Sequence, residues 1–95
     1  MLCLAVTYVV KPGTEAAAAE HFRALIEGSR AEAGCRTYVV HRSTDDARTF
    51  FIYEVYDDQA ALEAHRTTPH FLQHGRGGVQ PLAESRVALT CTPIQ

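Results

Sequence analysis

Four stretches of the chain are rich in β-branched and aromatic residues and have the length of strands. They are Leu2–Val10, Cys35–Arg42, Thr49–Tyr56 and Ser85–Cys91. After the first strand, apolar residues recur at three- and four-residue intervals, from Ala18 through Phe22 to Ile26, which predicts an amphipathic helix that runs to about Glu32. Two short helices are predicted between the third and fourth strands.

Capping and turn residues mark the ends of these elements. Thr14 is placed as the N-cap of the long helix, and Gly34 is placed to end it in a left-handed conformation. Asp57 or Asp58 is expected to cap the first short helix. The glycine-rich stretch Gly75–Gly78 predicts a loop before the last strand.

The order strand, helix, strand, strand, helices, strand is typical of the ferredoxin-like split βαβ fold, in the α+β class. It predicts a four-stranded antiparallel sheet with helices on one face. The strands carry apolar side chains in both alternation phases, so the face without helices is also apolar. We therefore expect a homodimer that packs through this sheet face, the alternative being a monomer with a partly apolar sheet.

The 95 residues suffice for one domain, predicted to span residues 1–95. The chain is 46% hydrophobic and 21% charged with a formal charge of −2, which argues against a nucleic-acid partner. No apolar run approaches the roughly 20 residues of a membrane helix, and Met1 leads directly into a strand, so we expect no membrane contact and a cytoplasmic location. Three widely spaced cysteines without a CxxC pair favour neither a disulfide scaffold nor a zinc site.

Histidines are the strongest candidates for chemistry, because three of them surround the predicted helix break at Thr68–Pro69. His65 lies on the apolar side of its helix and is expected to point toward the sheet. His70 follows Pro69 in the first turn of the next helix, where the helix dipole disfavours a protonated ring and keeps a neutral base available. His41, near the end of the second strand, is a third candidate pocket residue.

Each histidine also has a purely structural interpretation. His65 could be a buried ring bonded to backbone at the helix break, and His70 could satisfy free amides of a helix start. His41 could be exposed near the hairpin turn, and His74 is expected to face solvent. A metal site built from His65, His70 and His74 is disfavoured, since no HExxH or carboxylate-rich motif accompanies them, and we predict no metal.

Glu54 interrupts the apolar strand FFIYEVY. A carboxylate in such a run should be paired or have a raised pKa, which makes Glu54 a candidate acid, base or histidine orienter. Strict alternation places it on the same face as Ile52 and opposite to Tyr53. The structural alternative is an ion pair with Arg42 or Arg36 across the hairpin.

The segments FIYEVYDD (51–58) and AALEAHRTTPHF (60–71) resemble the signature of the antibiotic biosynthesis monooxygenase family. The motifs KPG (11–13) and EAGC (32–35) extend the resemblance over nearly the whole chain. It implies a dimeric α+β barrel, in agreement with the apolar face inferred from the strands. Members of this family include monooxygenases that work without flavin, haem or metal, and an isomerase of the phosphorylated autoinducer-2 signal.

In the monooxygenase interpretation, a base deprotonates a small quinol or aromatic polyketide-like substrate, and the resulting anion reduces O2 without a cofactor. The predicted catalytic residues are His65 or His70 as base and Glu54 as orienter or second proton carrier. The predicted substrate-binding residues are Phe71, Tyr53, Phe22, His41 and Arg42.

Two other functions stay open at this stage. In the isomerase, the same acid and base would move a proton through an enediolate, with Arg42, Arg66 or Arg76 holding the phosphate. In a binding module, a dimer would hold a small aromatic ligand without turning it over. The chain has no tryptophan, which disfavours the haem-degrading branch of the fold.

Overall fold

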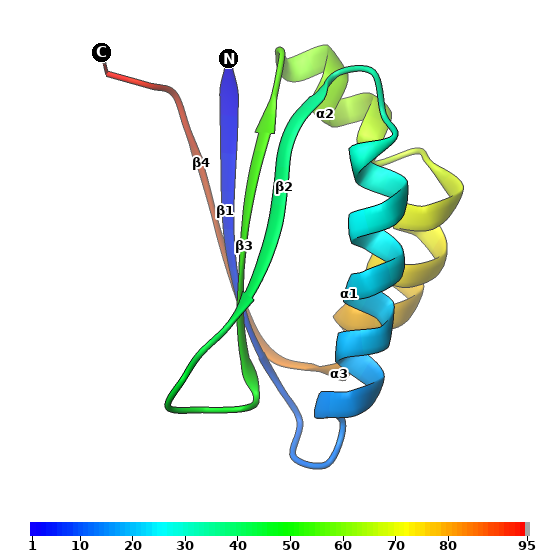
Figure 1. The fold of residues 1–95 in the computed structure, drawn as a ribbon, viewed down its shortest axis with the longest axis vertical. Helices are drawn as coiled ribbons and strands as arrows, with labels where there is room; N and C mark the ends of the chain where they lie inside the picture. Colours follow the sequence, from blue (N-terminus) through cyan, green and yellow to red (C-terminus); the bar gives the residue numbers. More distant parts are fainter. Residues whose placement is uncertain (95) are drawn as a thin grey trace.

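A computed structural model describes residues 1–94 and contains one four-stranded sheet with helices on one side (Figure 1). In chain order the elements are β1 (Leu2–Val10), α1 (Glu15–Arg30), β2 (Cys35–Arg42), β3 (Thr49–Tyr56), α2 (Gln59–His65), the π-helix η1 (Phe71–Val79), α3 (Gln80–Leu82) and β4 (Ala83–Cys91). The strand order is β2-β3-β1-β4, and all neighbouring strands are antiparallel. The ferredoxin-like α+β prediction is confirmed.

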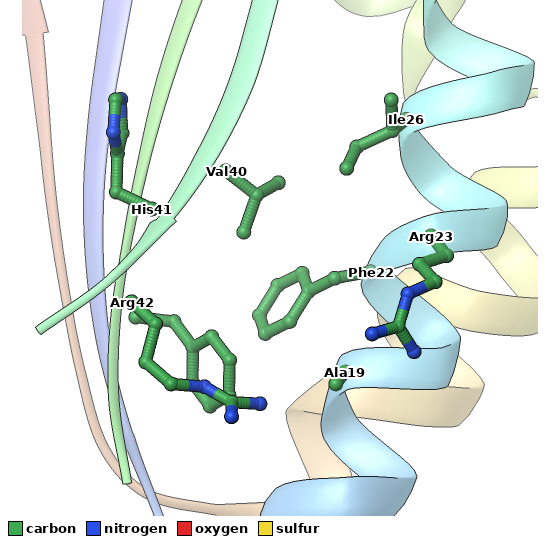
Figure 2. Close-up of a pocket in the computed structure, with 8 residues that line it drawn as sticks. Ala19, Phe22, Arg23, Ile26, Val40, His41 and Arg42 are labelled. Carbon is green, nitrogen blue, oxygen red and sulfur yellow. The ribbon is translucent and has the colours of Figure 1, made fainter. Parts of the chain in front are cut away.

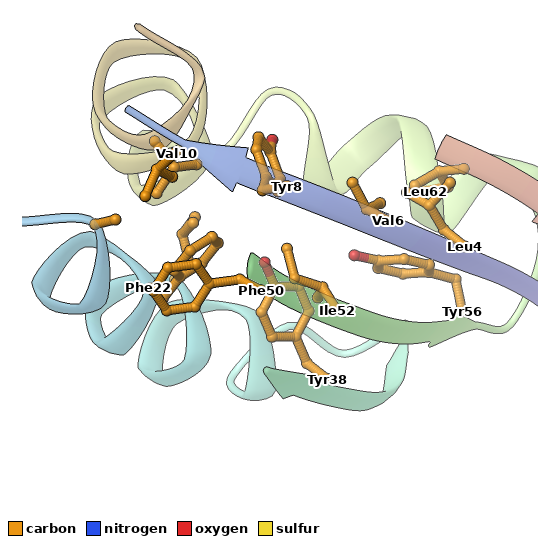
Figure 3. Packing of buried hydrophobic residues seen from close by; sticks show 13 residues of the cluster. Leu4, Val6, Tyr8, Val10, Phe22, Tyr38, Phe50, Ile52, Tyr56 and Leu62 are labelled. Atoms are coloured by element: carbon orange, nitrogen blue, oxygen red, sulfur yellow. The ribbon is translucent and has the colours of Figure 1, made fainter. Parts of the chain in front are cut away.

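The core lies between the helices and one face of the sheet (Figure 3). Along β1, the even-numbered residues from Leu4 to Val10 are buried beneath the helices, and their odd-numbered neighbours point to the other face. Phe22 of α1 packs on Phe50 of β3, with ring centroids 4.9 Å apart. This alternation decides which strand residues can reach a site on the helix side.

The sheet face without helices carries large apolar side chains. Phe51 and Tyr53 of β3 are 39% and 41% exposed, and Val87 and Leu89 of β4 are 68% and 63% exposed. The register places Ala5 of β1 between Tyr53 and Leu89. The apolar positions therefore form one continuous surface, named here the open sheet face.

The helix caps are partly as predicted. The Asp58 carboxylate accepts a hydrogen bond from the Ala61 amide at 2.9 Å and so caps α2. Gly13 is the one position among residues 1–94 with a positive φ, so the prediction of a left-handed Gly34 is wrong. Gly34 instead allows close packing, because a Cβ there would lie 2.6 Å from the Cβ of Ala61.

The prediction of a loop at Gly75–Gly78 is also wrong, since these residues continue the helix as part of η1. The glycines let neighbouring rings approach the helix backbone. A Cβ on Gly78 would lie 2.6 Å from Nδ1 of His21 on α1.

Among residues 1–94, none of the helices has the length and apolar character needed to span a membrane.

Candidate active site

The candidate site forms around Glu54, which β3 directs toward the helices. Its side chain is 5% exposed, and it faces Leu4 of β1 and Tyr38 of β2 across the two strand pairs. The hydroxyl of Tyr56, two residues along the same face, donates a hydrogen bond of 2.6 Å to Oε1 of Glu54. The carboxyl group is therefore buried, and among residues 1–94 it forms no salt bridge with a lysine or arginine.

His65, the last residue of α2, lies opposite this carboxyl group. Its side chain is 3% exposed, and its Nε2 lies 3.9 Å from Oε1 of Glu54. The rings of Phe71 and Tyr56 enclose it, with centroids 5.1 Å and 5.3 Å away. The histidine predicted to point toward the sheet does so.

Glu32, in the turn after α1, fixes the orientation of His65. Its Oε2 lies 2.8 Å from Nδ1 of His65 and also contacts Nε2 of His70. A carboxylate only accepts hydrogen bonds, so each of these ring nitrogens carries a proton. In neutral His65 the lone pair is then on Nε2, the nitrogen that faces Glu54.

Burial shifts both titrating groups toward their neutral forms. Desolvation raises the pKa of Glu54 to about 7, although the hydrogen bond from Tyr56 acts against it. Desolvation lowers the pKa of His65, which the contact with Glu32 counteracts in part. A protonated carboxyl group and a neutral imidazole therefore coexist near neutral pH, a pairing suited to moving a proton between two positions of one substrate.

The two groups line a small cavity between the sheet and η1. Its volume is about 30 Å³, enough for a water molecule. Tyr8, Tyr38 and Phe71 contribute aromatic walls, and Arg66 and Arg86 contribute guanidinium groups. Arg86 of β4 donates a hydrogen bond of 3.0 Å to the hydroxyl of Tyr8. A substrate larger than water requires side chains at this cavity to move.

The model of the family described as antibiotic biosynthesis monooxygenase matches residues 1–76. The chain belongs to this family. A relative in Mycobacterium tuberculosis, which carries the provisional name monooxygenase Rv0793, is 34% identical over 83 residues that cover 87% of this chain and 80% of the relative. The family resemblance inferred from the strand and helix motifs is confirmed.

Other relatives differ in the activity that their names give. An isomerase of (4S)-4-hydroxy-5-phosphonooxypentane-2,3-dione from Yersinia enterocolitica is 43% identical over 54 residues, which cover 57% of this chain and 56% of that protein. Membership of the antibiotic biosynthesis monooxygenase family thus leaves more than one reaction open.

Solved structures share the whole fold of this chain. PA3566 from Pseudomonas aeruginosa is 36% identical, covers 99% of this chain and 94% of its own, and has a TM-score of 0.91. A structure from Nitrosomonas europaea, which carries the provisional title of antibiotic biosynthesis monooxygenase, is 28% identical, covers 100% of both chains, and has a TM-score of 0.93.

The structure separates the residues predicted for this site into three groups. Glu54, His65 and Phe71 line the cavity, and His70 joins them through Glu32. Tyr53 and His41 point to the open sheet face, where the ring of His41 lies 5.7 Å from that of Phe51. Phe22 and Arg42 line a different hollow, between α1 and β2.

Two structural alternatives for the candidate residues are wrong. Arg36 forms its ion pair with Asp57, and Arg42 stacks on Phe50, so neither is the partner of Glu54. His74 does not simply face solvent, because its Nδ1 lies 2.9 Å from Nδ1 of His21 in a partly buried contact.

Glu32 is the functional candidate that sequence reasoning missed. Its carboxylate and the nearest nitrogens of His65 and His70 lie within 4.8 Å of one another, a donor set of the kind that binds zinc or iron. We interpret the three residues as an acid–base cluster, since Oε2 of Glu32 already accepts hydrogen bonds from both histidine rings. The acidic residue in the EAGC motif was the available sign of it.

Proposed function

We propose that this protein is a cofactor-independent monooxygenase that oxidises a small quinol or aromatic polyketide-like substrate with O2. The observation that carries the proposal is the placement of His65, whose Nδ1 contacts Glu32 and whose Nε2 faces a buried cavity beside Glu54. A base of this kind can ionise a phenol or an activated methylene in the absence of bulk water.

In the proposed reaction, His65 removes a proton and the electron-rich substrate anion reduces O2. One oxygen atom forms a bond to the substrate carbon. The O–O bond then breaks as a second proton leaves that carbon, which becomes a carbonyl, and the other oxygen atom departs as water. The substrate supplies the electrons, so the protein supplies a base, an acid and a dry pocket.

Glu54 is proposed to act as the proton donor in this sequence. Its raised pKa keeps a large fraction of the carboxyl group protonated near neutral pH. With the two groups 3.9 Å apart, one substrate oxygen placed beside the pair could contact both. Phe71 packs against His65 and forms the aromatic wall. His70 is proposed to orient Glu32 rather than to contact substrate, since its Nε2 is bonded to that carboxylate.

The protein is proposed to act as a homodimer through the open sheet face. Phe51, Tyr53, Val87 and Leu89 expose apolar area on this face, away from the helices. Contiguous apolar patches of this kind are uncommon on monomers, and a second copy offers a matching surface.

An isomerase acting on a phosphorylated substrate is the second candidate. Arg66 and Arg86 line the same cavity as His65 and Glu54 and could hold a phosphate group. The relatives named as isomerases favour this candidate through their 43% identity, although the match spans little more than half of each of those proteins.

Oxygen uptake by the chelator-treated protein with hydroquinones and anthrones tests the proposal. We expect turnover above the spontaneous rate, a loss of at least about 100-fold in His65→Ala, and a smaller loss in Glu32→Gln. Glu63→Gln removes an exposed carboxylate from the same helix as His65 and should keep the full rate.

His65→Gln, checked for folding by circular dichroism, separates loss of the base from loss of structure. Full turnover in either His65 variant would contradict the proposal. Absence of oxygen uptake with every substrate, together with proton exchange into a phosphorylated hydroxyketone, would favour the isomerase. Ligand binding without either reaction would favour the binding module.

A further inference from the structure

A second hollow lies between α1 and the edge strand β2, apart from the candidate active site (Figure 2). Its volume is about 290 Å³, close to the lower end of the roughly 300–1,000 Å³ range of small-molecule sites. We name it the α1–β2 groove. It shares no lining residue with the cavity around Glu54.

The inner surface of the α1–β2 groove is apolar. Phe22 and Phe50 form its buried base, and Ile26 and Val40 stand half-buried on the two walls. Figure 2 shows the side chains of Phe22, Ile26 and Val40 directed into the space between the helix and the strand. His41 points away from this space, so its side chain is not part of the apolar surface.

One end of the groove is cationic. The Arg42 guanidinium lies 4.8 Å from the centroid of the Phe50 ring, and no carboxylate among residues 1–94 forms a salt bridge with it. Arg23 lies on the α1 side of the groove but pairs with Glu20 on its own helix. Arg42 therefore offers a planar fork of donors suited to a carboxylate, beside an apolar surface.

We propose that the α1–β2 groove binds a small aromatic carboxylate of one or two rings. The rings would pack between Ile26 and Val40, and the carboxylate would pair with Arg42. On the β2–β3 ladder, Arg42 is opposite Phe50 and Tyr38 is opposite Glu54. Four residues of strand separate the two positions, or about 13 Å, so this ligand would not contact His65.

The groove lies on the helix side of the sheet and would stay accessible in a dimer formed through the open sheet face (Figure 1). The ligand site is thus independent of both the proposed reaction and the proposed dimer. Failure of either proposal leaves this one testable.

The experiment measures binding of 2-naphthoate to the full chain by calorimetry and by amide chemical shifts. We expect Arg42→Gln to weaken binding at least about fivefold, while Arg36→Gln, an exposed arginine on the same strand, leaves it unchanged. The neutral analogue 2-naphthalenemethanol should bind the wild type more weakly and should not distinguish the wild type from Arg42→Gln. Shifts are expected at Ile26 and Val40.

Three results would overturn the proposal. They are equal affinity of wild type and Arg42→Gln for 2-naphthoate, equal affinity of wild type for the acid and the alcohol, and shifts centred on His65 and Phe71 in place of Ile26 and Val40. Both variants alter exposed side chains, so loss of folding does not obscure the comparison.

Discussion

At the scale of single residues, burial decides which protonation states of Glu54 and His65 the fold favours. An ion pair between them would lower the pKa of the acid and raise that of the base. The opposite directions hold here, with the pKa of Glu54 raised and that of His65 lowered, chiefly by desolvation. Their 3.9 Å separation, longer than a hydrogen bond, fits two neutral groups that could both contact one substrate.

The raised pKa of Glu54 predicts a pH-dependent cost in stability. The folded protein holds a proton on Glu54 up to a pKa of about 7, whereas the unfolded chain releases it near 4.5. Between these values the folded state binds more protons, so the free energy of unfolding falls as pH rises, by up to about 3 kcal/mol. Glu54→Gln removes this component and should become the more stable protein above pH 7.

Urea denaturation at a series of pH values measures the effect as the difference between wild type and Glu54→Gln. Subtracting the variant removes most of the contribution of His65, whose lowered pKa acts in the other direction below pH 6.5. Exposed Glu63→Gln is the matched control and should give a flat difference. A flat difference for Glu54→Gln as well would show that folding does not raise the pKa of the carboxyl group.

The sequence indicates Glu54 and His65 as candidates, because a lone carboxylate in an apolar strand and a histidine on an apolar helix face both conflict with their surroundings. Glu32 gives no such conflict. It stands in a polar turn and meets His65 across 33 residues of chain, so its role depends on how the turn packs on α2. Phe22 and Arg42 line a different hollow from His65 because of how α1 packs on β2, which the sequence does not give.

At the scale of elements, the segment after Thr68 is held against α1 by close approach of rings to glycine. The Thr68 hydroxyl accepts a hydrogen bond from the Phe71 amide at 3.3 Å, a capping contact at the helix break predicted at Thr68–Pro69. Gly28, within α1, leaves room for His70, since a Cβ there would lie 2.4 Å from Cγ of the His70 ring. A helix-disfavoured glycine thus makes space for a residue that contacts Glu32.

Gly28→Ala is expected to destabilise the protein by about 1–3 kcal/mol, because the new methyl group overlaps the His70 ring. In a His70→Ala background the ring contact is gone and only the Cβ of residue 70, 2.8 Å from the new methyl group, remains close. The same change should therefore cost less there, and the helix propensity of alanine offsets part of that cost. Thermal denaturation of the four proteins in this double-mutant cycle measures the coupling. Equal effects of Gly28→Ala in both backgrounds would contradict the close approach of His70.

Close packing around glycine also explains why residues 75–78 are helical and do not form the predicted loop. Glycine-rich composition predicts a loop because isolated helices disfavour glycine. Here Gly75 and Gly78 are buried, and the rings of Phe71 and His21 occupy the space that side chains would take. Packing against α1 therefore outweighs local propensity, and such contacts are visible only when both helices are in place.

At the scale of the whole molecule, the sheet divides the chemistry between its two faces. The helix side holds the acid–base cluster and the α1–β2 groove. The open sheet face holds apolar residues, and β4 is exposed along most of its length because no helix covers it. The strand pattern predicted both apolar faces, since alternation assigns residues to faces without any knowledge of tertiary contacts.

Leu89→Glu is expected to convert the proposed dimer into a monomer. Leu89 is 63% exposed on the open sheet face, and in a two-fold symmetric dimer the change places two carboxylates in one apolar interface. Desolvation of these charges should weaken association at least about 100-fold. Sedimentation equilibrium across a concentration series measures the shift from twice the chain mass to the chain mass of 10.5 kDa. Leu72→Glu is the control, because Leu72 is 46% exposed on η1 and lies on the helix side. A wild type that sediments as a monomer, or a Leu89→Glu variant that remains dimeric beside it, would contradict assembly through the open sheet face.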